Sequence, residues 1–244
     1  VLSETAFCPL ILLQLILWIA ASRSEQPGRR RGLALAAGVT AGVATLVRPS
    51  WLLFTPFAGA LFVALGKHRA RNSGVVLVMI GGLVVTMTPW WIRNFQVSHR
   101  FIATTLQVGA SLYDGWNPQA TGASDMNFLP TIVDQQRASD TNSPTTPAAT
   151  FEYRLDKRLR DAAIAWAWEN PVQVTKLAGI KLVRMWNLWP NAPEFQGSVT
   201  RWIVLATYLP LIVCAAWGAF LFCRSSWPCT LCLLPTVYLT LLHM

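Results

Sequence analysis

Residues 74–91 have the sequence GVVLVMIGGLVVTMTPWW, and this stretch decides the fold that we expect. It contains no charged side chain, so it can cross hydrocarbon as a helix whose backbone hydrogen bonds are all internal. Pro89 removes one backbone donor near its end, and the paired tryptophans suit the headgroup zone. Arg93 and Asn94 follow. We therefore expect a membrane helix to end here, with Arg93 and Asn94 in water and a long polar region beyond them.

The composition favours an integral membrane protein. Apolar residues make up 53% of the chain, charged residues only 13%, and there are 12 tryptophans. A soluble domain would carry about a quarter of its residues as charges. The cysteines lie in or beside apolar segments, where inert packing is the simplest interpretation of all five: Cys8, Cys214, Cys223, Cys229 and Cys232.

Six apolar segments predict an all-α polytopic membrane protein with about six transmembrane helices. The second and third are shorter than the roughly 20 residues that a span requires, and only Arg48-Pro49-Ser50 joins them, so we expect a tight helical hairpin. A re-entrant pair is the alternative. The segments cover residues 5–21, 32–47, 51–65, 74–91, 202–222 and 230–244.

Basic residues predict the orientation. The links at residues 22–31 and 66–73 are rich in Arg and Lys, so both should face the cytoplasm. Arg48 and the segment 94–199 then lie outside. We expect membrane helices in residues 1–93, an external domain of about 105 residues at 94–199, and further membrane helices in 200–244. The net charge of +9 therefore requires no nucleic-acid partner.

The external segment has two parts. Residues 104–149 are rich in Gly, Ser, Thr, Asn and Pro and predict a loop. Residues 151–168 show apolar positions at helical spacing and predict an amphipathic helix. Asn170 should cap a second helix that has Pro171 in its first turn and lies in the outer membrane interface over residues 172–186.

Several short motifs occur in a fixed order along the chain, at residues 3–7, 46–49, 89–94, 114–118, 169–171 and 181–186. That order resembles the bacterial membrane glycosyltransferases of the GT-C class. This class is related to protein mannosyltransferases and to the aminoarabinose transferase that modifies lipid A. The resemblance covers most of the chain, and only the ordered set is moderately specific.

The resemblance implies transfer of a sugar from a polyprenyl-phosphate donor to a lipid, glycan or protein acceptor at the outer face of the bacterial cytoplasmic membrane. In that class a carboxylate of the first external loop acts as base or binds a metal. We expect that loop upstream of Val1, in a part that this fragment lacks. The catalytic residue is thus unassigned, a divalent metal stays open, and no metal ligand is predicted. The expected partners are membrane lipid and the lipid-linked sugar.

Five residues are predicted to bind substrate. Arg48 and Arg93 can hold the lipid phosphate, and Asn94 can hydrogen-bond sugar hydroxyls. Asp114 and Asn117 lie where the family places a substrate loop. The alternatives are snorkelling for Arg48, interfacial anchoring for Arg93, and an ordinary turn for Asp114.

Weaker candidates carry two interpretations each. Glu4 either orients a cation or an acceptor hydroxyl, or caps its helix. Asp125 either contacts sugar or metal, or is a solvated turn residue. Lys181 and Arg184 either steer an anionic headgroup or form the wet side of an interfacial helix. The tryptophans offer faces for sugars or anchor the membrane surface: Trp116, Trp166, Trp168, Trp186 and Trp189.

Other function classes stay open. A transporter or flippase of a lipid-linked or small polar substrate is the main alternative, although the apolar cores carry almost no charge. A purely structural membrane subunit is the third. No Gly-rich phosphate loop, His-Glu-x-x-His or Gly-x-Ser-x-Gly motif occurs, which disfavours a soluble nucleotide-sugar enzyme.

Overall fold

The computed structural model describes residues 2–142, 149–189, 197–225 and 230–244, and every regular element among them is helical. The all-α prediction is confirmed for these residues. The chain divides into two compact units, which we describe separately: unit 1 is residues 1–89 with 186–243, and unit 2 is residues 90–185.

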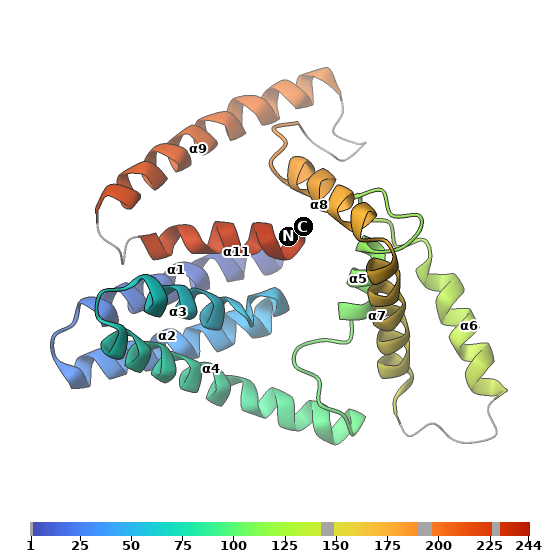
Figure 1. Cartoon of the computed structure of the whole chain (residues 1–244), viewed down its shortest axis with the longest axis horizontal. Helices are drawn as coiled ribbons and strands as arrows, with labels where there is room; N and C mark the ends of the chain where they lie inside the picture. The colour runs from blue at the N-terminus through green and yellow to red at the C-terminus, as the bar shows by residue number, and fades with distance from the viewer. Residues whose placement is uncertain (1, 143–148, 190–196, 226–229) are drawn as a thin grey trace. The chain divides into compact units, whose positions relative to one another are not determined.

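Unit 1 begins with two antiparallel helices, α1 (Leu2–Arg23) and α2 (Pro27–Val47), which lie side by side in Figure 1. A short 3-10 turn, Pro49–Trp51, then leads into α3 (Phe54–Leu65). This is the expected hairpin. Arg48 stands in extended conformation between the helices, because Pro49 disfavours a helical residue before it.

Glycines allow α2 to approach α4 (Arg69–Ser98) closely. A Cβ atom added at Gly38 would lie 2.1 Å from the Met79 carbonyl oxygen, and one at Gly42 would lie 2.5 Å from the Thr86 Cβ. From the other side, a Cβ at Gly82 would lie 2.7 Å from the Leu35 oxygen. Gly38 and Gly42 are four residues apart, which is the small-residue spacing of close-packed membrane helices.

Trp51 is the centre of the apolar core of unit 1. Its fully buried ring stacks on Phe54 with ring centroids 4.0 Å apart. Its indole N–H donates to Gln14 Oε1 over 2.7 Å, and Gln14 Nε2 donates to Thr55 Oγ1 over 3.0 Å. The Tyr238 ring packs edge-on against Trp51. Both ends of the buried Gln14 amide are therefore hydrogen-bonded, which avoids the cost of burying an unpaired amide group.

The sequence prediction that the fourth helix ends at the paired tryptophans is wrong. α4 continues through Pro89 to Ser98, so Arg93 and Asn94 are helical. A proline inside a membrane helix removes a single backbone bond, and threonine hydroxyls nearby can take up carbonyl groups. Thr88 Oγ1 donates to the Val84 oxygen in this turn. The chain leaves the helix only at His99, whose φ of +53° is left-handed.

Among the residues that the structure describes, three helices are long and apolar enough to cross a membrane: Glu4–Arg23, Arg69–Ser98 and Ser198–Arg224. They correspond to the first, fourth and fifth predicted segments. The apolar segments Pro49–Leu65 and Leu231–His243 are shorter. The second predicted segment forms most of the 21-residue α2, which carries three arginines at residues 29–31. Three of the six predicted spans therefore have the length and composition that a membrane helix requires, and the total of six stays a prediction.

The last part of unit 1 contains α9 (Ser198–Ser225), a 3-10 turn at Leu231–Leu233 and α11 (Leu234–His243). The Tyr238 hydroxyl of α11 donates to the Ser50 oxygen over 2.5 Å. The most apolar window of α9 has none of its residues buried. Such a helix requires an apolar surrounding, which lipid provides.

The described residues of unit 2 form four further helices, α5 (Val108–Gly115), α6 (Leu129–Thr141), α7 (Phe151–Glu169) and α8 (Pro171–Met185). The predicted helices over residues 151–168 and 172–186 are confirmed as α7 and α8, and the membrane-interface position of α8 stays a prediction. The prediction of a loop over residues 104–149 is wrong, because α5 and α6 lie within it. Most of the low-complexity stretch 141–147 lies outside the described residues. Asn170 stands at both helix ends: its backbone oxygen accepts the Val174 N–H over 3.0 Å at the start of α8, and its side-chain amide donates to the Trp166 oxygen over 2.9 Å at the end of α7.

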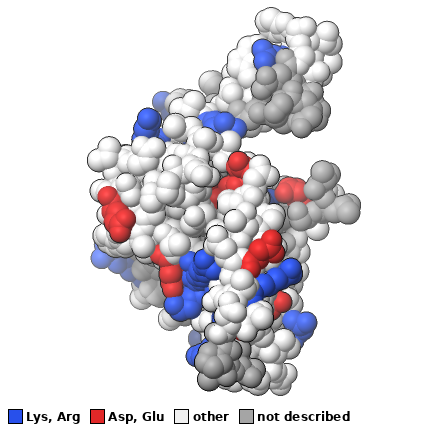
Figure 2. Space-filling view, turned by 90° about the vertical axis from the view of Figure 1, so that its right-hand side faces the viewer, with Lys and Arg blue, Asp and Glu red and all other residues white. Residues whose placement is uncertain are grey.

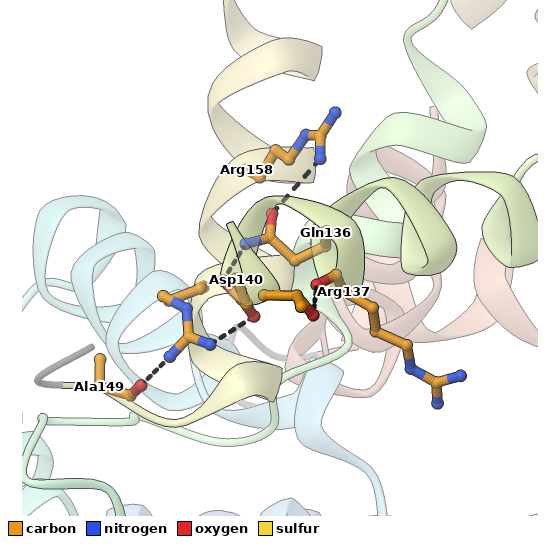
Figure 3. Close-up of polar contacts among 7 residues, drawn as sticks. Gln136, Arg137, Asp140, Ala149 and Arg158 are labelled. Atoms are coloured by element: carbon orange, nitrogen blue, oxygen red, sulfur yellow. Dashed lines mark hydrogen bonds and ion pairs between the residues drawn. The ribbon is translucent and has the colours of Figure 1, made fainter. Parts of the chain in front are cut away.

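Charged side chains join α6 to α7 (Figure 3). Arg154 donates to Asp140 over 2.6 Å, and Gln136 donates to the other Asp140 oxygen over 3.0 Å. Arg158 donates to both Gln135 and Gln136. On the face shown in Figure 2, acidic and basic side chains lie next to one another. The polar face of α7 is therefore paired with α6.

Candidate functional site

A pocket of about 460 Å³ lies in unit 2 between the end of α5 and the start of α6. Its lining includes two of the predicted substrate residues, Asp114 and Asn117, together with Asp125. None of its described lining residues is a lysine or an arginine. Hydroxyl and amide groups of a neutral or cationic ligand fit such a lining better than a phosphate does.

Asn117 shapes the entry to this pocket. Its Nδ2 donates to the Tyr113 oxygen over 2.7 Å, which closes the end of α5, and its Oδ1 accepts the Gln119 N–H over 2.7 Å. The side chain is 8% exposed. Because both ends of the amide are engaged within the protein, the structure supports a shaping role and gives no direct support for the predicted sugar contact.

The two carboxylates are connected through the backbone. Asp114 Oδ1 accepts the Asp125 N–H over 2.7 Å, and Asp125 Oδ1 accepts the Asn127 N–H over 3.0 Å. These bonds fold the loop after α5 around the pocket. Gly122, with φ of +81°, lets the same loop pass close to Ile180 of α8. The solvated-turn interpretation of Asp125 is therefore correct locally, although the turn borders a pocket.

Two aromatic rings complete the lining. The Tyr113 ring, from the last turn of α5, packs against the Phe128 ring with centroids 4.9 Å apart and an angle of 63° between the planes. Aromatic rings next to hydrogen-bonding groups suit a ligand with apolar and polar faces. Neither ring was predicted to bind substrate, because the sequence predicts a loop over residues 104–149. Leu129-Pro130 is the local sign of a helix start there.

Lys181 of α8 lies beneath the end of α5. A Cβ atom added at Gly115 would stand 2.5 Å from Lys181 Nζ, so a larger residue there would require the end of the lysine side chain to move. Burial lowers the pKa of Lys181, and the charge of Asp114 partly offsets that effect. Lys181 is therefore half-buried within unit 2 and does not lie on the wet side of the helix.

Arg93 and Asn94 differ in exposure, because Arg93 is exposed and Asn94 is buried. The Arg93 guanidinium lies 5.5 Å from the centroid of the Trp90 ring, and its Nη1 is 3.4 Å from Asn94 Oδ1. Asn94 is 8% exposed. The indole N–H groups of Trp90 and Trp91 donate to the oxygens of Thr104 and Ala103, which fix the chain after α4. The prediction that the two residues emerge into water is wrong for Asn94.

Arg48 forms an ion pair with Glu4 at one end of unit 1. The Arg48 Nη1 lies 3.0 Å from Glu4 Oε1, and the guanidinium lies 5.7 Å from the centroid of the Phe7 ring. Both side chains are partly exposed. Glu4 also stands in the first turn of α1, so the ion pair agrees with either interpretation of Glu4, and both stay predictions. Arg48 belongs to unit 1 and Arg93 to unit 2, so their joint contact with one headgroup stays a prediction.

No metal ligands can be assigned. Within the described residues, there is no group of three or more His, Cys, Asp or Glu that can hold a metal ion. The described cysteines, Cys8, Cys214, Cys223 and Cys232, are free thiols, and Cys229 lies outside the described residues.

In comparisons with protein-family models, curated proteins and solved structures, no match to this chain was found.

Proposed function

We propose that the chain is part of a membrane glycosyltransferase that moves a sugar from a polyprenyl-phosphate donor to a lipid, glycan or protein acceptor. The observation that carries this proposal is the pocket of unit 2, in which carboxylates, amides and aromatic rings adjoin one another. The ordered motifs that resemble the GT-C class support it. The catalytic residue stays unassigned.

The Asp114 carboxylate of this pocket can accept further hydrogen bonds from a sugar. A carboxylate offers about four lone-pair sites, and the Asp125 amide occupies one of those on Asp114. Hydroxyl groups of a sugar can donate to the others, while its apolar face packs on the Tyr113 ring. Asn117 keeps the end of α5 in place. Of the two predicted residues in this pocket, Asp114 and not Asn117 is therefore proposed to contact the sugar.

Arg48 is proposed to hold the donor phosphate. Its planar guanidinium can form two parallel bonds to phosphate oxygens. Glu4 occupies the Arg48 Nη1 group in the structure, so a phosphate would compete with this carboxylate or bind beside it. Phe7 beneath the guanidinium restricts its position.

The proposed topology places the basic links in the cytoplasm and unit 2 outside, in the bacterial cytoplasmic membrane. It can be tested with single cysteines in a background free of other thiols. An impermeant thiol reagent applied from outside should label Ser124→Cys and should leave Ser73→Cys unlabelled. The reverse pattern contradicts the topology.

The pocket is tested with Asp114→Asn in the complete protein. Asparagine keeps an oxygen for the Asp125 N–H but removes the charge, so the loop should keep its fold. We expect transfer from polyprenyl-phosphate sugars to fall by about tenfold, since a hydrogen bond to a charged group contributes about 1.5 kcal/mol or more. Asp134→Asn, an exposed carboxylate of α6 outside the pocket lining, is the control. Equal activity of both variants would remove Asp114 from the site.

Arg48 is tested by comparing alanine with lysine. Arg48→Ala should reduce transfer more than Arg48→Lys does, because lysine keeps the charge and loses only the paired geometry. Wild-type activity in both variants would exclude a phosphate-binding role. Movement of the lipid-linked substrate without sugar transfer would favour the transporter.

A further inference from the structure

A second pocket, of about 450 Å³, lies in unit 1 at the turn between α1 and α2. It is at the opposite end of this helix pair from Arg48 and Glu4 and has no part in the proposed transfer. Two arginines line it, Arg23 from the last turn of α1 and Arg29 from the first turns of α2. The other lining residues are Ala20, Ser24, Glu25, Gln26 and Leu33.

The first turn of α2 has no acidic side chain to balance the positive charge of its arginines. Arg29, Arg30 and Arg31 follow Pro27, the first residue of α2, and the first turn of the helix contains no acidic side chain. Cations next to a helix start are unfavourable, because the aligned peptide dipoles make that end positive. Gln26 gives no side-chain cap. An anion in the pocket would interact favourably with the arginines and with the helix start.

The pocket also has an apolar wall. Ala20 of α1 and Leu33 of α2 line it on the side of the helix pair, and both are partly buried. No heavy atom of a neighbouring segment lies within 4 Å of a Cβ built at Gly28 or at Gly32, so the space beside this part of α2 is open. A free inorganic anion would use only the polar side of such a pocket. A phospholipid carries a phosphate next to an apolar glycerol and acyl region.

We propose that the pocket binds the phosphate headgroup of an anionic phospholipid, with Arg23 and Arg29 on the phosphate and Ala20 and Leu33 against the lipid beyond it. α1 is one of the helices that can cross a membrane, and its last residue is Arg23. If α1 spans the membrane, the pocket at its end lies at the level of the lipid headgroups. Glu25 lines the same pocket and opposes an anion. The negative charge of Glu25 should weaken binding of the phosphate, so neutralising Glu25 should strengthen it.

The experiment measures the thermal unfolding midpoint of the complete chain in a zwitterionic detergent. The probes are a short-chain phosphatidylglycerol, a short-chain phosphatidylcholine and inorganic phosphate, each titrated separately. A ligand that binds the folded state raises the midpoint in a saturable manner. We expect phosphatidylglycerol alone to do so. Arg29→Gln should weaken its apparent affinity by about tenfold, as loss of one charge-assisted bond implies, and Glu25→Gln should strengthen it.

Arg69→Gln is the matched control, because Arg69 also stands at a helix start on a basic link, that of α4. It should leave the affinity unchanged. An equal loss in Arg69→Gln and Arg29→Gln would show a general charge effect and overturn the site. Equal shifts with phosphatidylcholine would overturn the requirement for an anion, and equal shifts with inorganic phosphate would overturn the assignment to a lipid. Each variant's midpoint without ligand shows whether it is folded.

Discussion

The α1–α4 bundle of unit 1 and the helices of unit 2 are held together by different kinds of contact. In unit 1, glycines bring α2 and α4 close together, and aromatic rings fill the core around Trp51. In unit 2, buried or half-buried carboxylates join helices: Asp156 accepts the Gly109 N–H over 2.6 Å, and Asp140 pairs with Arg154. Unit 1 should therefore respond mainly to changes in side-chain volume, and unit 2 to changes in charge.

The largest expected effect on this comparison comes from a side chain added between α2 and α4. Gly38→Leu should lower the free energy of unfolding of the bundle by about 3 kcal/mol, because overpacking forces backbone to move. The added Cβ alone would lie 2.1 Å from the Met79 carbonyl oxygen. Thermal unfolding in detergent measures the loss.

Gly32→Leu is the control within the same helix, since a Cβ there meets nothing within 4 Å. It should leave stability nearly unchanged. If both leucine variants unfold at the same temperature as the unmodified chain, the close contact of α2 and α4 does not hold the bundle together.

The next effect concerns the buried carboxylate of unit 2. Asp156 is 4% exposed, and Gly109 approaches it so closely that a Cβ there would lie 2.0 Å from the Asp156 carbonyl oxygen. Asp156→Ala leaves the Gly109 N–H without its acceptor, which should cost about 2 kcal/mol. Amide hydrogen exchange of α5 measures the loss. Asp161→Ala removes an exposed carboxylate of the same helix, α7, and should have little effect.

The smallest effect is a dependence of the α6–α7 contact on pH. The Arg154 hydrogen bond holds the pKa of Asp140 below its ordinary value of 3.8. The contact therefore stabilises the folded state fully above that value, and this contribution is lost as the pH falls through the lowered pKa of the folded state. Hydrogen exchange of α6 between about pH 5 and about pH 2 follows this loss.

Arg154→Gln should remove most of this pH dependence, whereas Arg137→Gln should preserve it. Arg137 is the matched control because its own pair, with Asp134, is exposed and loose at 4.0 Å. An unchanged pH profile in Arg154→Gln would show that the Asp140 contact contributes nothing to holding α6 against α7.

Local sequence patterns predicted part of the site and part of the fold. The spacing of apolar residues was sufficient for α7 and α8, and the position of Asp114 and Asn117 was predicted from a motif. The motif could not predict that the Asn117 amide is engaged by Tyr113 and Gln119, because these bonds depend on where α5 ends. α5 itself has only eight residues, and a period of 3.6 is hardly visible over two turns.

The sequence by itself determined that this is a helical chain with segments suited to a membrane, because hydropathy and charge are properties of consecutive residues. It also determined the basic links, since arginine next to an apolar segment needs no distant partner to be recognised. Tertiary structure decided which distant residues meet: Arg48 with Glu4, Trp51 with Gln14, and Asp156 with Gly109. The physical reason is that each of these contacts depends on the register between two packed helices, which glycines and volume complementarity fix and composition does not.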